Sequence, residues 1–250
     1  GVNRSALTAG NYSVTVVDQN GCSASASVTI TQPSTPVNIT VDNTSSIACY
    51  GNNTGTINIT ASGGVPGYSY LWSDNSNLED RTNMLSGTYF VTASDQQGCV
   101  ATVSATINQP LSPLSVDTII ATDVKCYGAA TGSLLSTVSG GTVPYSFNWN
   151  NSTTTQNLTN VIAGTYTITV TDANACSASA SASIAQPATD LTAAAVASNV
   201  SCFGGNNGAV NLNANVGVTP YIFDWGGGVT TQILTGVSAG TYHVVVTDSN

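Results

Sequence analysis

The ten residues "AGTYTITVTD", from Ala163 to Asp172, determine how the rest of the chain is interpreted. Tyr166, Ile168 and Val170 lie two apart and share one face, while threonines occupy the other face, as in a half-buried β-strand. Three close copies of this strand occur elsewhere: "AGNYSVTVVD" at 9–18, "SGTYFVTASD" at 86–95 and "AGTYHVVVTD" at 239–248. The chain therefore contains one strand pattern four times.

Cysteines show that the whole unit repeats, and not only this strand. One series, Cys22, Cys99 and Cys176, has spacings of 77 residues, and a second series, Cys49, Cys126 and Cys202, has spacings of 77 and 76. Tryptophans and Gln-Pro pairs follow the same period, which is the signature of a tandem array. The predicted domains are the C-terminal part of a truncated repeat at 1–33, complete repeats at 34–110 and 111–187, and a repeat truncated before its last strand at 188–250.

Alternation within each unit predicts an all-β fold. In "PYSFNWN", residues 144–150, the three aromatic residues lie two apart and the polar residues point the other way. No stretch has apolar residues at helical spacing, and about six or seven short strands separated by turn residues fit a small immunoglobulin-like antiparallel β-sandwich. The expected core residues are Trp72, Trp149, Trp225, Tyr12, Tyr89, Tyr166 and Tyr242.

A glycine precedes each strand tyrosine by two residues, as at Gly87 and Gly164. This arrangement is similar to the tyrosine corner of immunoglobulin-like sandwiches, in which the tyrosine hydroxyl bonds to the backbone a few residues upstream. Each strand then ends at an aspartate, and the predicted role of that aspartate is to cap the following turn. Calcium binding is the alternative for these four residues, Asp18, Asp95, Asp172 and Asp248, although few other acids lie near them.

Composition excludes several classes of function. The 250 residues include only three Lys plus Arg, and the net charge is −9, so nucleic-acid binding is not expected. No run reaches the roughly 20 apolar residues of a membrane span. The one histidine, His243, is matched in the other units by Ser13, Phe90 and Thr167, which argues against a shared catalytic or metal-binding role. We therefore expect no enzyme activity, no metal site and no cofactor other than the calcium alternative.

The cysteine pattern predicts disulfides and an oxidising, extracellular location. The two cysteines of each complete repeat are 50 residues apart, which suggests the pairs Cys49–Cys99 and Cys126–Cys176. Cys22 and Cys202 would then pair with cysteines outside this chain. Such a staple would stabilise a small sandwich by roughly 4 kcal/mol in the chain-entropy model.

Two surface features admit alternative interpretations. The stripe of Tyr68, Tyr70 and Trp72 could stack against sugars, but its period-2 position opposite polar residues favours core packing. The threonine row of 163–172 is the kind of feature found in ice-binding proteins, but it is irregular in the other units, so a solvated strand face is favoured.

The ordered motifs "CYGNNTGTINI", "YSYLW", "SGTYFVTASDQQGC" and "INQP" together resemble the SprB-type repeat of giant surface adhesins of gliding Bacteroidetes, over essentially the whole chain. The resemblance implies a cell-surface protein exported by the type IX secretion system, with a part in gliding motility and in contact with the substratum. The tripeptide from Asp117 to Ile119 is also similar to a Bacteroidetes O-glycosylation signal, which would modify Thr118.

The expected function is mechanical. Proline-bearing joints such as "QPSTP" and "QPLSP" favour a rod of semi-rigid repeats, so the array would act as a force-bearing spacer in surface adhesion. Its expected partners are neighbouring repeats and a surface polysaccharide or substratum. The alternatives are a glycan-binding array that acts by avidity, or a structural filament that assembles laterally or end to end.

Overall fold

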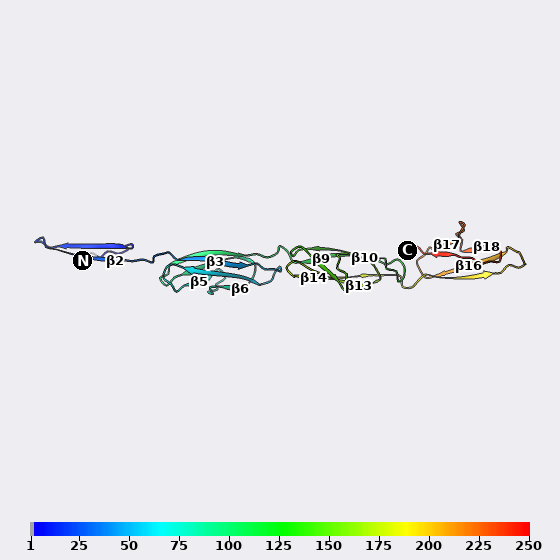
Figure 1. The fold of residues 1–250 in the computed structure, drawn as a ribbon, viewed down its shortest axis with the longest axis horizontal. Coiled ribbons are helices and arrows are strands. Elements are labelled where there is room, and N and C mark those ends of the chain that lie inside the picture. Colours follow the sequence, from blue (N-terminus) through cyan, green and yellow to red (C-terminus); the bar gives the residue numbers. More distant parts are fainter. Residues whose placement is uncertain (1–2) are drawn as a thin grey trace. The chain divides into compact units, whose positions relative to one another are not determined.

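The computed structural model describes residues 3–250, and the strands group as the repeat period requires (Figure 1). Every regular element in the described part is a β-strand, and no helix able to span a membrane occurs there. The chain divides into two compact units, Gly1–Leu111 and Ser112–Asn250. The strands are β1 (Gly10–Val17), β2 (Ser23–Ile30), β3 (Asn38–Ser45), β4 (Gly55–Ser62), β5 (Ser69–Trp72), β6 (Arg81–Met84), β7 (Gly87–Ser94), β8 (Val100–Ile107), β9 (Ser115–Thr122), β10 (Gly132–Ser139), β11 (Ser146–Trp149), β12 (Leu158–Val161), β13 (Gly164–Thr171), β14 (Ser177–Ile184), β15 (Thr192–Ser198), β16 (Gly208–Asn215), β17 (Ile222–Asp224), β18 (Ile233–Val237) and β19 (Val245–Thr247).

Each complete repeat is a sandwich of two three-stranded antiparallel sheets. In residues 34–110 the sheets have the orders β3-β4-β6 and β5-β7-β8, and in residues 111–187 the orders β9-β10-β12 and β11-β13-β14. The strand predicted within Ala163–Asp172 is β13, which lies between β11 and β14. The predicted all-β, immunoglobulin-like sandwich is confirmed.

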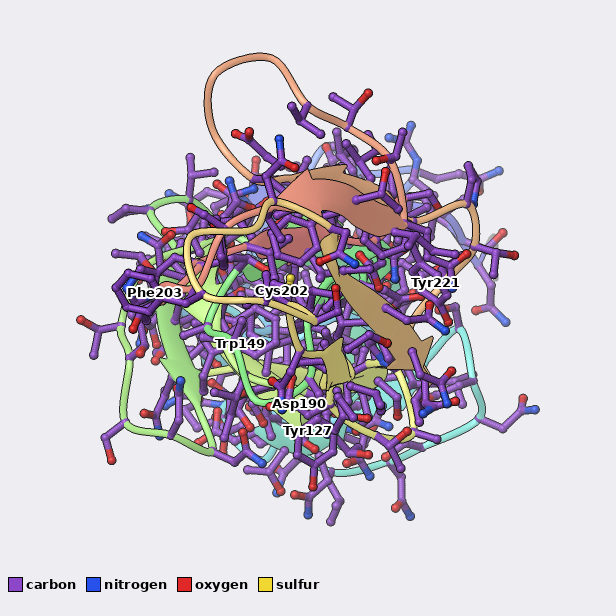
Figure 2. All side chains as sticks on the ribbon, turned by 90° about the vertical axis from the view of Figure 1, so that its right-hand side faces the viewer. Tyr127, Trp149, Asp190, Cys202, Phe203 and Tyr221 are labelled. Atoms are coloured by element: carbon purple, nitrogen blue, oxygen red, sulfur yellow. The ribbon has the colours of Figure 1, made fainter. Side chains whose placement is uncertain are left out.

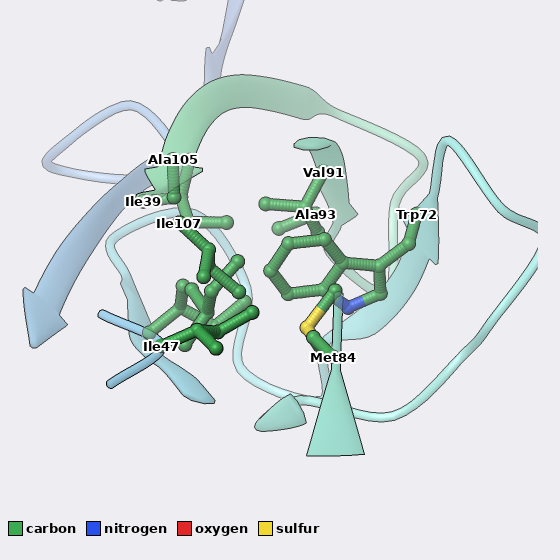
Figure 3. Packing of buried hydrophobic residues seen from close by; sticks show 10 residues of the cluster. Ile39, Ile47, Trp72, Met84, Val91, Ala93, Ala105 and Ile107 are labelled. Atoms are coloured by element: carbon green, nitrogen blue, oxygen red, sulfur yellow. The ribbon is translucent and has the colours of Figure 1, made fainter. Parts of the chain in front are cut away.

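The core of residues 34–110 lies between the two sheets and is filled from every strand (Figure 3). Trp72 is 2% exposed, and Figure 3 shows its ring between Val91, Ala93 and Met84. The equivalent core in residues 111–187 surrounds Trp149, which is 1% exposed. Burial of each large apolar side chain contributes roughly 1.5–3 kcal/mol, so these two tryptophans are major contributors to repeat stability.

The predicted tyrosine corner is present in all four repeats, complete and truncated. The Tyr166 hydroxyl donates to the carbonyl oxygen of Ile162 at 2.9 Å, four residues upstream. The same bond joins Tyr12 to Thr8 at 2.8 Å, Tyr89 to Leu85 at 3.1 Å and Tyr242 to Ser238 at 2.8 Å. In the two complete repeats, this bond satisfies the polar end of a ring, Tyr89 or Tyr166, whose apolar part packs against the core.

The two truncated repeats, at 3–33 and 188–250, bury their aromatic side chains less completely than the complete repeats do. Residues 188–250 form the sheets β15-β16-β18 and β17-β19, and residues 3–33 contribute the hairpin β1-β2. Tyr242 is 38% exposed, and Trp225 and Tyr12 are only half-buried, so their predicted place in a closed core is wrong for the described structure. The physical reason is that Tyr12 lies on the two-stranded sheet β1-β2, and Trp225 and Tyr242 flank the two-stranded sheet β17-β19, so the apolar face is partly uncovered.

The two ends of a complete repeat are distinct. The chain enters residues 34–110 at one end, which we call the leading end, where the N–H of Gly64 donates to the carbonyl of Thr35 at 3.0 Å. It leaves at the opposite, trailing end, where the N–H of Ile47 donates to the carbonyl of Asn108 at 2.8 Å. Strands β3 and β8 both run from the leading to the trailing end and contact one another.

One feature of the tryptophan environment changes between repeats. Arg81 lies over the Trp72 ring at 5.4 Å and donates to both carboxylate oxygens of Asp74, at 2.8 and 2.6 Å. This bond lowers the pKa of Asp74 to about 2. The position equivalent to Arg81 in the next repeat is Leu158, which is buried in the core around Trp149. An arginine paired with an aspartate therefore covers the tryptophan in one repeat, and an aliphatic side chain occupies that position in the other.

Candidate functional site

The recurring aspartate organises the leading end of each repeat. One oxygen of the Asp172 carboxylate accepts the N–H groups of Asn174 and Cys176, both at 2.9 Å, and so closes the turn between β13 and β14. The other oxygen accepts the N–H of Thr142, also at 2.9 Å, from the loop between β10 and β11. The aspartate therefore caps its own turn, as its sequence position predicts, and also ties that turn to a second loop.

The equivalent aspartates of the other repeats make the same turn bonds, and Asp95 and Asp248 also bond to the second loop. Asp95 accepts the N–H groups of Gln97, Cys99 and Val65 at 2.9, 2.8 and 2.9 Å. Asp248 accepts those of Val218 and Asn250, at 3.0 and 3.1 Å. Asp18 accepts those of Asn20 and Cys22, both at 2.9 Å.

These N–H groups also determine the protonation of the buried aspartates. The N–H of Val65, together with those of the turn, lowers the pKa of Asp95 although burial acts in the opposite direction. Burial would raise the pKa of Asp172, but the N–H groups of Thr142, Cys176 and Asn174 outweigh it, and the pKa is lowered. Both carboxylates are therefore charged at neutral pH and are held by backbone dipoles.

This chemistry predicts loss of stability in acid. The folded carboxylates bind a proton less readily than unfolded ones, whose pKa is about 3.9, so the contribution is present above that pH and is lost as the pH falls through the folded pKa. We expect the melting temperature to fall steeply below about pH 4. Thermal unfolding followed by circular dichroism between pH 7 and pH 2 measures this.

The matched comparison is the double variant Asp95→Asn, Asp172→Asn against Asp117→Asn, which removes a carboxylate from an exposed strand position. The double variant should melt lower at pH 7 and depend less on pH than the unchanged protein. A double variant with the same pH profile as the unchanged protein would show that these aspartates do not control acid stability.

The hydrogen bonding argues against calcium at these aspartates. Calcium prefers six to eight oxygen ligands, whereas the Asp95 and Asp172 carboxylates are surrounded by N–H donors. Within residues 3–250, no group of three or more acidic, histidine or cysteine side chains is placed to hold a metal ion. Calcium binding remains the less favoured prediction.

The aromatic stripe packs inward rather than forming an exposed platform. The Trp72 indole N–H donates to the Leu78 carbonyl at 2.7 Å, and the Tyr68 hydroxyl donates to the Gly63 carbonyl at 2.6 Å. Tyr70 is half-buried and donates to the Glu79 carboxylate at 2.7 Å; burial and this bond raise the pKa of Tyr70. The same indole bond occurs at Trp149 and Trp225, so the stripe supports the loop that follows it.

The remaining predicted positions lie on outer faces. Thr118 is exposed on β9, and its hydroxyl lies 2.7 Å from that of Thr137. Its O-glycosylation stays a prediction. The β13 threonines face serines of β14, with Thr165–Ser183 and Thr167–Ser181 hydroxyl distances of 2.9 and 2.8 Å. His243 is exposed outside the strands.

The predicted disulfides within repeats are wrong. Cys99 and Cys126 are exposed thiols, as are Cys22 and Cys202, whereas Cys49 and Cys176 are disulfide-bonded. The reason is that the two cysteines of a repeat lie at opposite ends. Cys49 is near the trailing end, where the neighbouring Gly51 N–H donates to the Gln109 side chain at 2.9 Å.

Cys99, in contrast, directly precedes β8 at the leading end. The eight residues of β8 separate the two ends by roughly 25 Å, at about 3.3 Å per residue. The α-carbons of a disulfide lie within about 7 Å of one another. No rotation of the side chains could close that distance, so a bond between Cys49 and Cys99 would require the sandwich to unfold.

An exposed aromatic residue follows each trailing-end cysteine, and it is not among the residues predicted from the sequence. Tyr50, Tyr127 and Phe203 are 46%, 50% and 109% exposed. Phe203 follows Cys202 on the loop between β15 and β16, and Figure 2 labels both residues. The repeated tripeptides "CYG", "CYG" and "CFG" are the signal that could have identified this position.

Inside the unit Ser112–Asn250, the trailing end of residues 111–187 meets the leading end of residues 188–250. A cleft of about 320 Å³ there is lined by Cys126 and Tyr127 on one side and by Asp248 and Asn250 on the other. The side-chain amide of Asn250 donates to the carbonyl of Lys125 at 3.0 Å. Successive repeats in this unit therefore touch through the residues that surround the cysteines.

The solved structures that align with this chain share little sequence with it. The N-terminal eight immunoglobulin domains of Down Syndrome Cell Adhesion Molecule are 12% identical, with a TM-score of 0.43, over 94% of this chain and 42% of that chain. A C-terminal 282-residue fragment of intimin is 17% identical, with a TM-score of 0.34, over 64% and 65%. A tetra-tandem repeat from the extending region of a large adhesion protein is 17% identical, with a TM-score of 0.25, over 98% and 75%. No curated protein sequence matches.

The sequence model of the SprB repeat matches three times, at residues 41–77, 118–154 and 194–230. Each match begins within the first strand of a unit and runs past its core tryptophan position, so the matches follow the period read from the cysteines. The resemblance to the SprB-type repeat that the sequence motifs indicate is therefore confirmed in these three segments.

Proposed function

We propose that this chain is a non-catalytic repeat region of a large cell-surface adhesin and acts as a semi-rigid, force-bearing spacer. The proposal includes an extracellular location, and it extends to export by the type IX secretion system and a part in gliding motility, which the family resemblance implies. The observation that carries the mechanical part is the path of the chain through each complete repeat.

A force applied along the chain loads each complete repeat in shear. Tension enters residues 34–110 at the start of β3 and leaves at the end of β8, and these two strands run in the same direction in contact. Pulling them apart lengthwise requires many contacts along eight-residue strands to break together. Strands peeled from one end would instead lose their contacts one at a time.

The short joints and the low charge support the same role. The segment between β8 and β9 contains two prolines, Pro110 and Pro113, whose fixed φ angles restrict the backbone. Only 6% of residues are charged, so the repeats have few surface ion pairs that salt could weaken. Such a spacer would keep its stiffness over a range of ionic strength.

Single-molecule pulling of the 250-residue chain in a reducing buffer tests the proposal. We expect two distinct unfolding events, one for each complete repeat. Each should add roughly 230–250 Å of contour length, which is the extended length at about 3.3–3.6 Å per residue less the roughly 25 Å that the folded repeat already spans. Extension without resolved force peaks would contradict a force-bearing role. Specific, saturable binding of the same chain on a glycan array would favour a glycan-binding array instead.

A further inference from the structure

The last strand of a complete repeat closes one edge of the sandwich. In residues 111–187 this strand is β14, which pairs with β13 along eight residues and contacts β9 of the opposite sheet. Its inward face carries three half-buried alanines and ends in Ile184, which is 3% exposed. Ile184 packs so closely on Gly132 that a β-carbon at the glycine would lie 2.8 Å from the isoleucine side chain. The core of this repeat is therefore complete only with β14 in place.

Residues 188–250 have the same framework without such a strand. In the described chain β19 pairs only with β17, although its equivalent, β13, lies between two strands. The seven residues of β15 are all exposed. Val244 and Val246 are half-buried, whereas both equivalent residues of β13 are 0% exposed. The space between β15 and β19 is therefore open.

Two hollows lie along this space, which we call the acceptor groove. One hollow, of about 290 Å³, is lined by Ala195 of β15 and Val246 of β19. The other, of about 270 Å³, is lined by Gly208 at the start of β16. In the preceding repeat β14 contacts β9 and β13, the equivalents of β15 and β19, and so covers both of these places. The acceptor groove thus has the position of a last strand.

The second hollow corresponds to the position that Ile184 fills. Gly208 is the equivalent of Gly132, but the three atoms nearest to a β-carbon at Gly208 include none from an isoleucine. Val200 lines the same hollow and is the equivalent of Val124, whose N–H donates to the carbonyl of the residue after Ile184 at 2.9 Å. The hollow is therefore the expected site for an isoleucine, and the N–H of Val200 is the expected donor to the strand that carries it.

We propose that the acceptor groove binds a β-strand from a separate polypeptide and that this strand has the chemistry of β14. The required pattern is small side chains that alternate with hydroxyl side chains, followed by an isoleucine at the next inward position. Main-chain hydrogen bonds to the unpaired edge of β19 supply affinity, and the isoleucine supplies specificity. Such strand donation joins two chains end to end without a covalent bond, which is an activity beyond that of a spacer.

Binding of a synthetic peptide to the 250-residue chain tests the proposal. The probe copies residues 177–187, "SASASASIAQP", carries a fluorophore at its N-terminus and contains no cysteine. In reducing buffer at pH 7, fluorescence anisotropy should show saturable binding of one peptide per chain. The matched peptide with Ile184→Ser should bind at least about tenfold more weakly, because it loses the burial of a large apolar side chain. Absence of saturable binding, or equal affinity of the two peptides, would overturn the proposal.

Two variants of β15 locate the binding site. Ala195→Arg places a long charged side chain in the acceptor groove and should weaken binding at least about tenfold. Val196→Arg places the same side chain on the opposite face of the strand, where Val196 is 68% exposed, and should leave the affinity unchanged. Both residues are exposed in the free chain, so both variants should keep its circular dichroism spectrum. Equal affinities of the two variants would mean that the peptide binds elsewhere.

Hydrogen exchange of the unchanged chain gives a readout that needs no variant. Saturating peptide should slow exchange in β15 and β19 and leave β9 and β13 unchanged, because β14 already occupies the equivalent groove of that repeat. Slower exchange in β1 and β2 alone would contradict the proposal. Concentration-dependent oligomers that bind no peptide would assign the groove to a second copy of the chain and would also overturn it. None of these measurements depends on resistance to force, so their failure is distinguishable from failure of the spacer function.

Discussion

Replacing Trp149 with alanine will unfold residues 111–187 while residues 34–110 stay folded. The Trp149 side chain is 1% exposed, and its indole N–H donates to the Thr155 carbonyl at 2.9 Å, so the substitution leaves a large cavity and an unpaired carbonyl. Truncation of a buried tryptophan costs about 3–5 kcal/mol. A single core in a domain of fewer than about 80 residues rarely supplies more than about 3–5 kcal/mol, so the loss is comparable to the whole stability of the repeat.

Urea unfolding followed by hydrogen exchange measures this prediction, because exchange reports each repeat separately. Protection should fall in β11 and β13 and stay unchanged in β5 and β7. The control is Trp225→Ala, since Trp225 makes the equivalent indole bond at 2.9 Å but is only half-buried and should cost less. Equal losses from the two substitutions, or loss of protection in both complete repeats, would contradict independent cores.

The strands were predictable from the sequence because their signal is local. Alternation of apolar and polar residues places Tyr166, Ile168 and Val170 on one face without knowledge of any partner strand. All three are buried in the structure. The tyrosine corner was predictable for the same reason, because the Tyr166 hydroxyl reaches a carbonyl only four residues away.

The cysteine pairing was not predictable from spacing, because it depends on which end of the sandwich each residue occupies. Two cysteines that are 50 residues apart in a repeat can lie side by side or at opposite ends of the sandwich. The direction of β8 decides between them, since it carries the chain from Cys99 towards Gln109, which is bonded near Cys49. Strand direction in turn depends on sheet order, which the sequence of one repeat does not specify.

The aspartate turn was predictable only in part. Capping by Asp172 of its own turn is a local feature, and the sequence indicates it. Its second bond, to Thr142, joins residues 30 apart and requires a loop that approaches the carboxylate closely. Gly141 makes that approach possible, and its importance follows only from the three-dimensional structure.

Gly141→Ala is therefore expected to destabilise residues 111–187 strongly. Gly141 has a φ of +60°, and a β-carbon there would lie 2.7 Å from the Asp172 carboxylate oxygen and 3.1 Å from Leu114. The left-handed backbone alone costs about 1–3 kcal/mol for a residue other than glycine. The clash adds to this cost, because relieving it moves the carboxylate away from the N–H of Thr142, to which it is bonded at 2.9 Å.

The matched control is Gly128→Ala in the same repeat, which separates the backbone cost from the clash. Gly128 has a similar φ of +71°, but a β-carbon there would meet nothing within 4 Å. Gly128→Ala should therefore show the backbone cost alone, and Gly141→Ala should lower the free energy of unfolding further, as measured by urea denaturation at pH 7. Equal losses from the two variants would mean that the carboxylate moves aside freely and that its bond to the second loop contributes nothing to stability. A greater loss at Gly141 that disappears below the pH at which Asp172 is protonated would identify the charged carboxylate as the group that requires glycine at this position.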